Sequence, residues 1–482
     1  MYDNNFNVID SVQKEFHQFF PKNGWVEHNA VEIWTDVKLL IQKILKKNKI
    51  NASQIHSIGI SNQRETTVLW DKKSGSPVCN AIVWQDRRTN YICQELKESN
   101  LEKKIQEITG LIVDPYFSAT KIKWILDNNS EAKKLLKHNN LLFGTIDSWL
   151  LWNLTEKESH LTDITNASRT MLYDSKKEEW SKELLNILNI PNSILPEVVS
   201  NTYDFGTTNL FGYPISIGGM AGDQQASAIG QVCFKKGQVK STYGTGCFVL
   251  MNIGEEFYLS KNKLITSVAY KIGNKKMYCY EGSIFVAGAA IQWLRDKLFF
   301  FKESKETEQL YSDAGEKDNI IVVPALTGLG APYWQPNVRG AIFGLTRDTS
   351  IAEIIKATLD SLCYQTFDLI KSMKKDSGIK ISEITVDGGM ADNSKFIQSL
   401  SNILQIKIVK PNNIEASALG VAYLAALSSG FIKDIDSIEK LLKSKNIDKK
   451  INSYNPKIDA LLIKNKILKW KKTISFLLKY YE

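Results

Sequence analysis

The chain of 482 residues carries 61 Lys and Arg against 52 Asp and Glu, which gives a formal net charge of +9, and 43% of its residues are hydrophobic. These proportions exclude a disordered chain, and the length exceeds what one hydrophobic core usually supports, so we expect two or three domains. Because the lysines are dispersed among acidic residues, the charge is typical of a solvated surface, and we expect no nucleic-acid partner.

Cysteine spacing and hydropathy indicate a cytoplasmic protein. The six cysteines form no C-x-x-C pair and have no His at zinc-ligand spacing, so we expect them to be small buried hydrophobes in a reducing compartment. No apolar run approaches the length of a membrane span, and the first residues carry Asp3 and Asp10 without the apolar core of a signal peptide. We therefore expect no membrane span.

Short β-branched runs alternate with longer amphipathic stretches along the chain, a pattern typical of α/β domains with partly parallel sheets. The expected strands are Ile55–Ser61, Thr66–Trp70, Ala81–Trp84, Ile215–Gly218, Gln238–Tyr243, Cys247–Asn252, Lys276–Tyr280, Ile320–Val323 and Ile384–Val386. The expected helices are Ala30–Lys47, Leu101–Ile108, Ser118–Asn128, Ile351–Met373 and Asn393–Leu404.

A change of composition near Gly230–Gly237 predicts a domain boundary, which divides the chain into residues 1–232 and 233–482. The basic and amphipathic stretch Lys457–Tyr481 predicts a C-terminal helix, with Leu461, Ile467, Trp470, Ile474 and Leu477 able to share one face. We expect that face to dock on the core; a helix lying on a membrane surface is the less favoured alternative.

Two segments in the first half combine opposite charges with an indole. The run SNQRETT at Ser61–Thr67 follows an expected strand and puts Arg64 beside Glu65, and VWQDRRT at Val83–Thr89 adds Trp84. Such a set suits a small polyhydroxylated ligand, because the charged groups can pair with hydroxyls while the carbon skeleton lies on the ring. Exposed loop charges are the alternative interpretation.

The segment GGMAGDQQAS at Gly218–Ser227 places a carboxylate on a glycine-flanked turn that leads into a helix. Asp223 there can accept a proton from a substrate hydroxyl, as the base of phosphoryl transfer does. It can equally cap the helix N-terminus.

Two glycine-rich turns in the second half are candidates for holding phosphates. The run STYGTGCF at Ser241–Phe248 predicts a tight hairpin whose amides and Thr245 hydroxyl face a phosphate, or an ordinary hairpin. The run VDGGMADN at Val386–Asn393 predicts a strand, a double-glycine turn and a helix start with Asn393 near its N-cap. The double glycine can let the backbone approach a nucleotide, or it can form a plain βα turn, and the two interpretations are equally favoured. The P-loop motif GxxxxGK[ST] and the protein-kinase catalytic loop are absent.

Taken together, these segments resemble the glycerol kinases of the FGGY family of carbohydrate kinases, which have the actin- and hexokinase-like fold. The match runs from about Phe16 to the C-terminal helix. Further matching runs are GWVEH at Gly24–His28, YFSATKIKWILDN at Tyr116–Asn128, TNASRTMLYD at Thr165–Asp174, EGSIFVAGAAIQWLRD at Glu281–Asp296, GLGAPYW at Gly328–Trp334 and the segment Gly340–Asp360. The NQRET and GWVEH runs favour glycerol kinases over the pentulose and gluconate kinases of the family.

The resemblance implies an α/β fold of two RNase-H-like domains flanking a central cleft, with glycerol bound between them and ATP held mainly by the second domain. The positions that match the family's glycerol contacts are Arg64, Glu65, Trp84, Tyr116, Asp223, Gln224 and Phe248. Those that match its ATP contacts are Thr245, Gly288, Gln292, Gly389 and Asn393. Asp223 would be the general base of in-line phosphoryl transfer that yields sn-glycerol 3-phosphate, the first step of glycerol catabolism. Mg²⁺ would accompany ATP, and no residue is assigned as its ligand. The resemblance also implies a homo-oligomer, either a dimer or a tetramer.

One feature of the family has no counterpart here. Glycerol kinases begin with a strand followed by a phosphate turn of the form D-x-G-T-T-S-x-R, whereas this chain opens at Tyr2-Asp3, which matches the second strand of that first hairpin. We therefore expect the first domain to lack its N-terminal strand, about twenty residues with its turn. A misassigned start, a catalytically impaired or non-catalytic polyol- or nucleotide-binding relative, and compensation by another element are the competing explanations.

Overall fold

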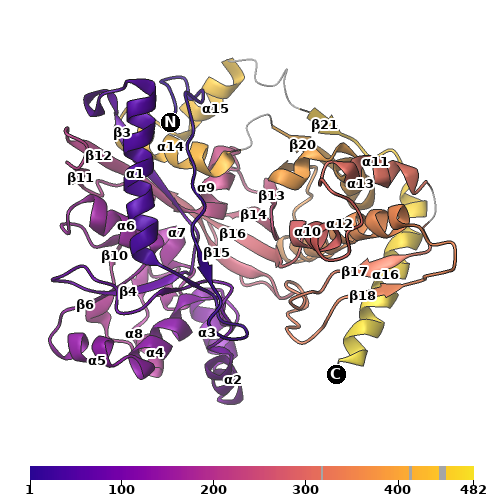
Figure 1. The fold of residues 1–482 in the computed structure, drawn as a ribbon, viewed down its shortest axis with the longest axis horizontal. Coiled ribbons are helices and arrows are strands. Elements are labelled where there is room, and N and C mark those ends of the chain that lie inside the picture. Colours follow the sequence, from indigo (N-terminus) through magenta and orange to yellow (C-terminus); the bar gives the residue numbers. More distant parts are fainter. Residues whose placement is uncertain (316–317, 412–414, 445–451, 482) are drawn as a thin grey trace.

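A computed structural model describes residues 1–315, 318–411, 415–444 and 452–481. It folds into two α/β lobes, drawn left and right in Figure 1, with strands β13 to β16 between them. The left lobe is formed mainly by the N-terminal half of the chain, and the right lobe by the C-terminal half. The expected two-domain α/β architecture is therefore confirmed.

The first lobe contains small sheets with helices around them. Its strands are β1 Gln18–Phe19, β2 Glu27–His28, β3 Ser57–Asn62, β4 Thr67–Asp71, β5 Ala81–Ile82, β6 Leu141–Thr145, β7 Leu161–Asp163, β8 Tyr173–Asp174, β9 Glu179–Trp180, β10 Glu197–Val199, β11 Thr207–Thr208 and β12 Ile215–Gly222. Its helices are α1 Ala30–Asn48, α2 Asn90–Glu98, α3 Glu102–Thr109, α4 Ser118–Asn128, α5 Ser130–Lys137, α6 Ile146–Leu154, α7 Ile164–Ala167, α8 Lys182–Leu188 and α9 Asp223–Gly230.

The second lobe is built on a sheet with the strand order β15-β16-β14-β13-β19-β20-β21. The strands of this half are β13 Val239–Tyr243, β14 Cys247–Gly254, β15 Ile265–Ile272, β16 Lys275–Ile284, β17 Ile321–Val323, β18 Ala341–Phe343, β19 Glu383–Asp387, β20 Lys407–Lys410 and β21 Asn452–Tyr454. The helices of this half are α10 Gly288–Asp296, α11 Glu306–Asp313, α12 Ile351–Ser377, α13 Ser394–Leu404, α14 Ala416–Ser428, α15 Ile435–Ser444 and α16 Ala460–Tyr480.

Local chemistry sets several of the expected boundaries. Helix α12 begins at Ile351 as expected, behind a capping box in which Ser350 and Glu353 satisfy each other's backbone amides. It continues four residues past its expected end at Met373, because the left-handed residue that stops it is Gly378. Helix α13 is capped by Asn393, whose side chain accepts from the amide of Phe396, as the sequence predicted. Strand β12 continues four residues past its expected end at Gly218, because its pairing with β3 extends to Gly222.

Helix α14 returns from the C-terminal half to the first lobe, where it packs against α9, β12 and β3. The crossing of α9 and α14 is close because both helices carry glycine at the contact: a Cβ at Gly420 would lie 1.9 Å from the backbone oxygen of Ala226, and one at Gly230 would lie 2.0 Å from that of Ala416. The division of the chain at 232/233 remains a prediction, since the later half also contributes to the first lobe.

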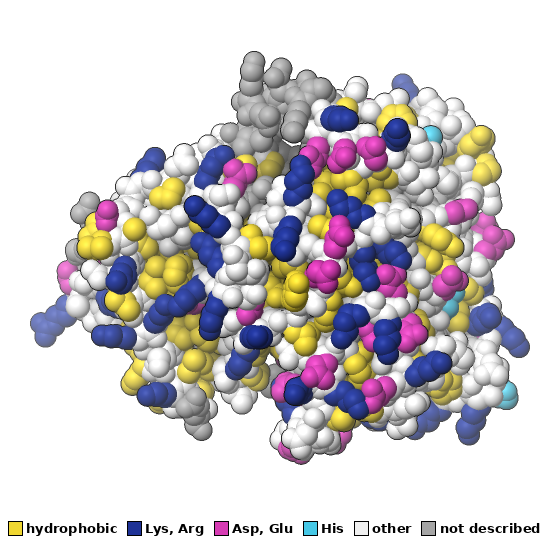
Figure 2. Space-filling model, turned by 180° about the vertical axis from the view of Figure 1, so that it is seen from behind, with side chains coloured by type: hydrophobic (Ala, Val, Ile, Leu, Met, Phe, Trp, Pro, Cys, Tyr) yellow, Lys and Arg dark blue, Asp and Glu magenta, His cyan; other side chains and the backbone are white. Residues whose placement is uncertain are grey.

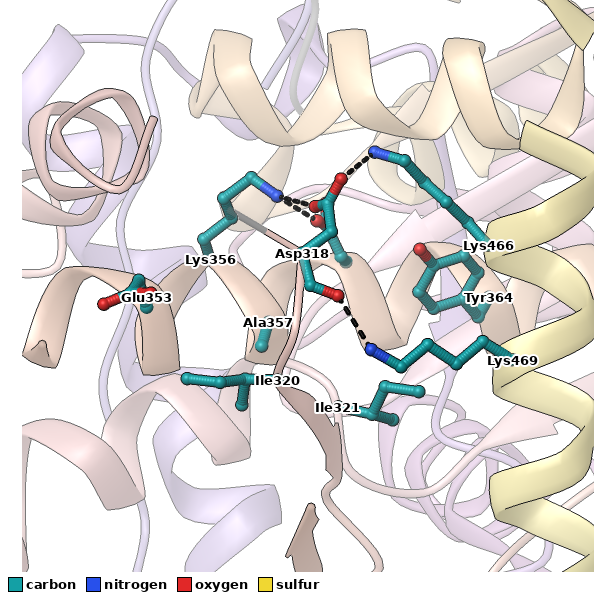
Figure 3. A pocket seen from close by; sticks show the side chains of 10 residues that line it. Asp318, Ile320, Ile321, Glu353, Lys356, Ala357, Tyr364, Lys466 and Lys469 are labelled. Carbon is teal, nitrogen blue, oxygen red and sulfur yellow. Dashed lines mark hydrogen bonds and ion pairs between the residues drawn. The ribbon is translucent and has the colours of Figure 1, made fainter. Parts of the chain in front are cut away.

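The C-terminal helix α16 is docked on the second lobe, as expected, through the buried side chains of Ile463, Trp470, Ile474 and Leu477. Leu461, which was predicted to share that face, is 74% exposed instead. Figure 3 shows the contacts that fix the helix: Lys466 reaches the carboxylate of Asp318 at 2.5 Å, and Lys469 donates to the Asp318 backbone oxygen at 3.0 Å. The hollow between them is about 30 Å³, roughly the share of one water.

The N-terminal residues do not form the expected hairpin strand. In place of a strand, Tyr2 forms an isolated bridge with Val8. The reason is local: the Asp3 carboxylate accepts from the amides of Asn5 and Asn7, both at 2.8 Å, and so turns the chain back on itself.

Surface and cysteines follow the sequence expectations. Figure 2 shows Lys and Arg side chains spread over the whole visible face, with Asp and Glu among them. Among the described residues no helix is both long and apolar enough to cross a bilayer. All six cysteines are free, and all but the half-buried Cys79 are buried.

Candidate active site

The parallel pairing of β3 and β12 creates the first part of the site. Their register ends with Asn62 opposite Gly222, so both strands stop at the same edge of the sheet. The segment after β3 carries Arg64 and Glu65, and the residue after β12 is Asp223. Because the carboxyl ends of parallel strands meet at one edge, these side chains converge.

Arg64 is the centre of this cluster. Its Nη1 donates to Glu281 Oε2 at 2.6 Å and to Gln225 Oε1 at 3.1 Å. Its Nε lies 3.1 Å from Asp223 Oδ1, but the geometry is not that of a hydrogen bond, and among the described residues this buried donor has no hydrogen-bond partner. The Asp223 side chain is 38% exposed, so a ligand can approach the pair from that side.

Glu65 is held by a second guanidinium. Arg169 Nε donates to Glu65 Oε1 at 2.6 Å, and Arg169 Nη1 lies 3.3 Å from Glu281 Oε1. The backbone of Glu65 has φ +64°, in the left-handed region, and its carbonyl accepts from the hydroxyls of Thr67 and Ser118, both at 3.0 Å. A non-glycine residue in this region is strained, and the two hydroxyl contacts to its carbonyl help to hold it there.

An aromatic wall joins the two halves. Trp84 contacts Tyr116 at 5.6 Å and Phe248 at 6.0 Å between ring centroids, both edge-on. Tyr116 in turn lies against Arg169, whose guanidinium carbon is 5.0 Å from the ring centroid. The indole and phenyl rings that the sequence singled out therefore lie beside the Arg64 and Glu65 cluster.

The buried charges perturb one another. Burial alone would raise the pKa of Glu281, but the guanidinium groups of Arg169 and Arg64 outweigh it and hold that pKa at about 2. The pKa of Glu65 is raised by burial in spite of Arg169 and Arg64. Burial raises the pKa of Tyr116 above its usual value, so its hydroxyl stays neutral and can donate a hydrogen bond.

A separate cavity of about 430 Å³ lies in the second lobe, within the size range of small-molecule sites. All five residues predicted for ATP are among the side chains and backbone that line it: Tyr243, Gly244, Thr245, Gly288, Ile291, Gln292, Ser304, Lys305, Thr307, Glu308, Leu359, Gly389, Met390, Asp392 and Asn393. The fold thus gathers residues from five separate segments into one hollow.

The β13–β14 hairpin closes one end of that cavity. The backbone oxygen of Thr245 accepts from the amides of Ala287 and Ala289 at 2.9 and 3.1 Å, so the hairpin caps the start of α10. Gly288 lets the two elements touch, because a Cβ there would lie 2.6 Å from the backbone oxygen of Gly244. The exposed Thr245 remains turned to the hollow.

The sequence indicated the family runs that contain Arg169 and Glu281 but did not single out either residue. Both are buried charges, and Glu281 directly follows the buried apolar run Met277–Tyr280 of strand β16. A buried charge requires a partner, so an acidic residue at the end of an apolar run was the available signal. Asp223 is the first residue of α9 and its N-cap is Gly222, so the capping alternative for Asp223 is wrong.

The described residues contain no group of three His, Cys, Asp or Glu side chains able to hold a metal ion. A magnesium ion bound mainly by nucleotide phosphates and waters does not need such a group.

Comparison with known proteins gives consistent matches along the chain. Residues 1–230 match the N-terminal domain, and residues 239–429 the C-terminal domain, of the FGGY family of carbohydrate kinases. The chain is 48% identical to the glycerol kinase of Enterococcus casseliflavus over 478 residues, which are 98% of this chain and 93% of that protein. It is 50% identical to the glycerol kinase of Streptococcus uberis over 97% of this chain and 93% of that protein.

Solved structures agree. The crystal structure of Plasmodium falciparum glycerol kinase with ADP matches with a TM-score of 0.91 at 36% identity, over 99% of this chain and 95% of that one. The crystal structure of a xyloylose kinase from Brucella ovis matches with a TM-score of 0.85 over 99% of this chain and 96% of that one, but at 20% identity it shows the fold alone.

Proposed function

Because the chain belongs to the FGGY family of carbohydrate kinases, we propose that it is an ATP-dependent glycerol kinase, which converts ATP and glycerol to ADP and sn-glycerol 3-phosphate. Identity of about half with glycerol kinases over nearly the whole chain supports this acceptor over the sugars of the wider family. We place the enzyme in the cytoplasm and expect a dimer or tetramer, which analytical ultracentrifugation would measure.

One observation supports the acceptor site above the others: the buried Nε of Arg64 has no hydrogen-bond partner in the described part of the chain and stands 3.1 Å from the partly exposed Asp223. An unpaired buried donor beside an accessible carboxylate fits an alcohol, whose hydroxyl can accept from one and donate to the other. Glu65, Tyr116 and Gln224 supply the remaining polar contacts in this proposal.

The proposed reaction is one in-line displacement. A terminal hydroxyl of glycerol gives its proton to the Asp223 carboxylate as its oxygen attacks the γ-phosphorus. The new O–P bond forms while the bond from the γ-phosphorus to the bridging oxygen breaks, and ADP leaves. Trp84 and Phe248 cover the carbon skeleton and keep water from competing for the phosphoryl group.

The nucleotide occupies the 430 Å³ cavity in this proposal. Thr245 and the adjacent hairpin face the phosphates, Gly389 leaves space for the backbone to approach, and Ile291 and Met390 offer apolar surface to the base. Mg²⁺ enters with ATP as part of the substrate and reduces the negative charge of the phosphates.

The test is ADP formation by the purified full chain with MgATP and either glycerol, dihydroxyacetone, xylulose or no acceptor. We expect ADP to form with glycerol and phosphorus NMR to identify glycerol 3-phosphate. Glycerol binding by calorimetry without any turnover would instead favour the non-catalytic alternative, and turnover with another acceptor alone would refute the substrate.

A further inference from the structure

Lys240 is a buried cation that the proposed mechanism leaves unexplained. It lies on β13 and its side chain is fully buried, yet it forms no ion pair among the described residues. Burial lowers the pKa of its ammonium group. The carboxylates of Asp387 and Asp223 oppose this shift from beyond ion-pair distance. Because an ammonium group without a carboxylate in direct contact is costly to bury, its position calls for a functional reason.

The contacts of Lys240 lead directly to the proposed base. Its Nζ donates to Gln224 Oε1 and, at 2.8 Å, to Thr242 Oγ1. The Gln224 Nε2 then donates to Asp223 Oδ2 at 3.1 Å. Lys240, Gln224 and Asp223 therefore form a chain of hydrogen bonds from the sheet of the second half to the start of α9.

The direction of this chain is fixed by chemistry. An ammonium group has donors only, and an ionised carboxylate has acceptors only. The amide of Gln224 must therefore turn its oxygen to Lys240 and its NH2 to Asp223. With Lys240 removed, the amide oxygen loses its anchor, so the Gln224 side chain is free to turn to other rotamers and its NH2 to leave the carboxylate.

We propose that Lys240 is a positioning residue, which fixes the amide of Gln224 so that its NH2 holds the Asp223 carboxylate in place for the acceptor hydroxyl. This inference rests on the proposed function, in which Asp223 takes the proton. Lys240 touches neither the acceptor nor the reacting atoms; it acts through Gln224. It also links the two halves, since α9 ends the first half and β13 opens the second.

A double-mutant cycle tests whether Lys240 acts through Gln224. Lys240→Met removes the donor and keeps an unbranched side chain. It should lower kcat with glycerol about tenfold to a hundredfold, as a misplaced catalytic group does. The KM for ATP should change less than about threefold. In a Gln224→Ala background the same substitution should lower kcat by less than about threefold. Equal losses in both backgrounds would overturn the proposal. Lys240→Arg, which keeps cationic donors, should recover part of kcat.

Two controls keep the outcome interpretable. If Lys240→Met does not fold, Lys240→Gln takes its place with the same expected dependence on Gln224. A crystal structure of the folded variant is independent of activity: we expect the contact from Gln224 Nε2 to Asp223 Oδ2 to be lost, and its retention would contradict the inference. If the wild-type chain forms no ADP in response to glycerol, the proposed function alone is refuted. The crystal structure of the Lys240 variant would still decide whether Lys240 holds Gln224 against Asp223.

Discussion

The buried carboxylate of Glu281 offers the sharpest test of the charge cluster. Glu281→Gln keeps the shape of the side chain but removes the charge that faces Arg64 at 2.6 Å and Arg169 at 3.3 Å. At an effective dielectric of about 20, each of these pairs is worth about 4 kcal/mol, or about 8 kcal/mol together. The variant no longer carries the free-energy cost of burying a carboxylate, and this offsets several kcal/mol of the loss. We therefore expect a net destabilisation of about 3–5 kcal/mol.

The pKa of Glu281 gives a second estimate of the same quantity. The shift from 4.5 to about 2 corresponds to about 3 kcal/mol. Because the folded-state pKa is depressed, this stabilisation is fully present above pH 4.5 and is lost as the pH falls through about 2. Wild type and Glu281→Gln should therefore differ most at neutral pH and converge in acid.

The measurement is urea unfolding at pH 7, followed by tryptophan fluorescence and calorimetry because two lobes can unfold separately. Glu383→Gln is the matched control: its carboxylate pairs with Lys407 at 2.7 Å, but the two side chains are 45% and 42% exposed, so we expect a loss under about 1 kcal/mol. Similar losses in the two variants would refute the reasoning that burial makes the Glu281 contacts strong.

Four other substitutions test separate features. Asp223→Asn should leave glycerol binding measurable by calorimetry while ADP formation falls about a hundredfold or more; unchanged turnover would remove Asp223 from the mechanism. Trp84→Ala should raise KM for glycerol more than KM for ATP, and equal changes would argue against an indole-lined acceptor site. Gly420→Ala should lower both the melting temperature and kcat, because its Cβ would lie 1.9 Å from the Ala226 oxygen and displace α9; an unchanged melting temperature would show that the crossing can loosen freely. Burial raises the pKa of Asp163 to about 7, so its contribution to the free energy of unfolding is most favourable below about pH 4 and declines towards pH 7. Melting curves should show the stability of Asp163→Asn rising relative to wild type by up to about 4 kcal/mol between these pH values. A stability difference that stays constant with pH would contradict the shift.

Features set by neighbours in the chain were predictable from the sequence. Helix α4 has the expected bounds, Asn393 caps α13, and the glycines of 244–246 form the expected hairpin. Hydrophobic periodicity and turn chemistry act over a few residues, so their pattern is legible without a fold. The candidate residues around Arg64 and Thr245 were likewise found from local motifs and a family resemblance.

Contacts between distant segments were decided only by the tertiary structure. Arg64 and Glu281 are 217 residues apart in the chain, and only the register of β3 with β12 and the placement of β16 bring them within 2.6 Å. The return of α14 to the first lobe and the chain from Lys240 to Asp223 likewise depend on which elements pack together. The sequence determined which residues carry the chemistry, whereas packing decided which charges share one buried space, because charge pairing depends on distance in space and on exclusion of water.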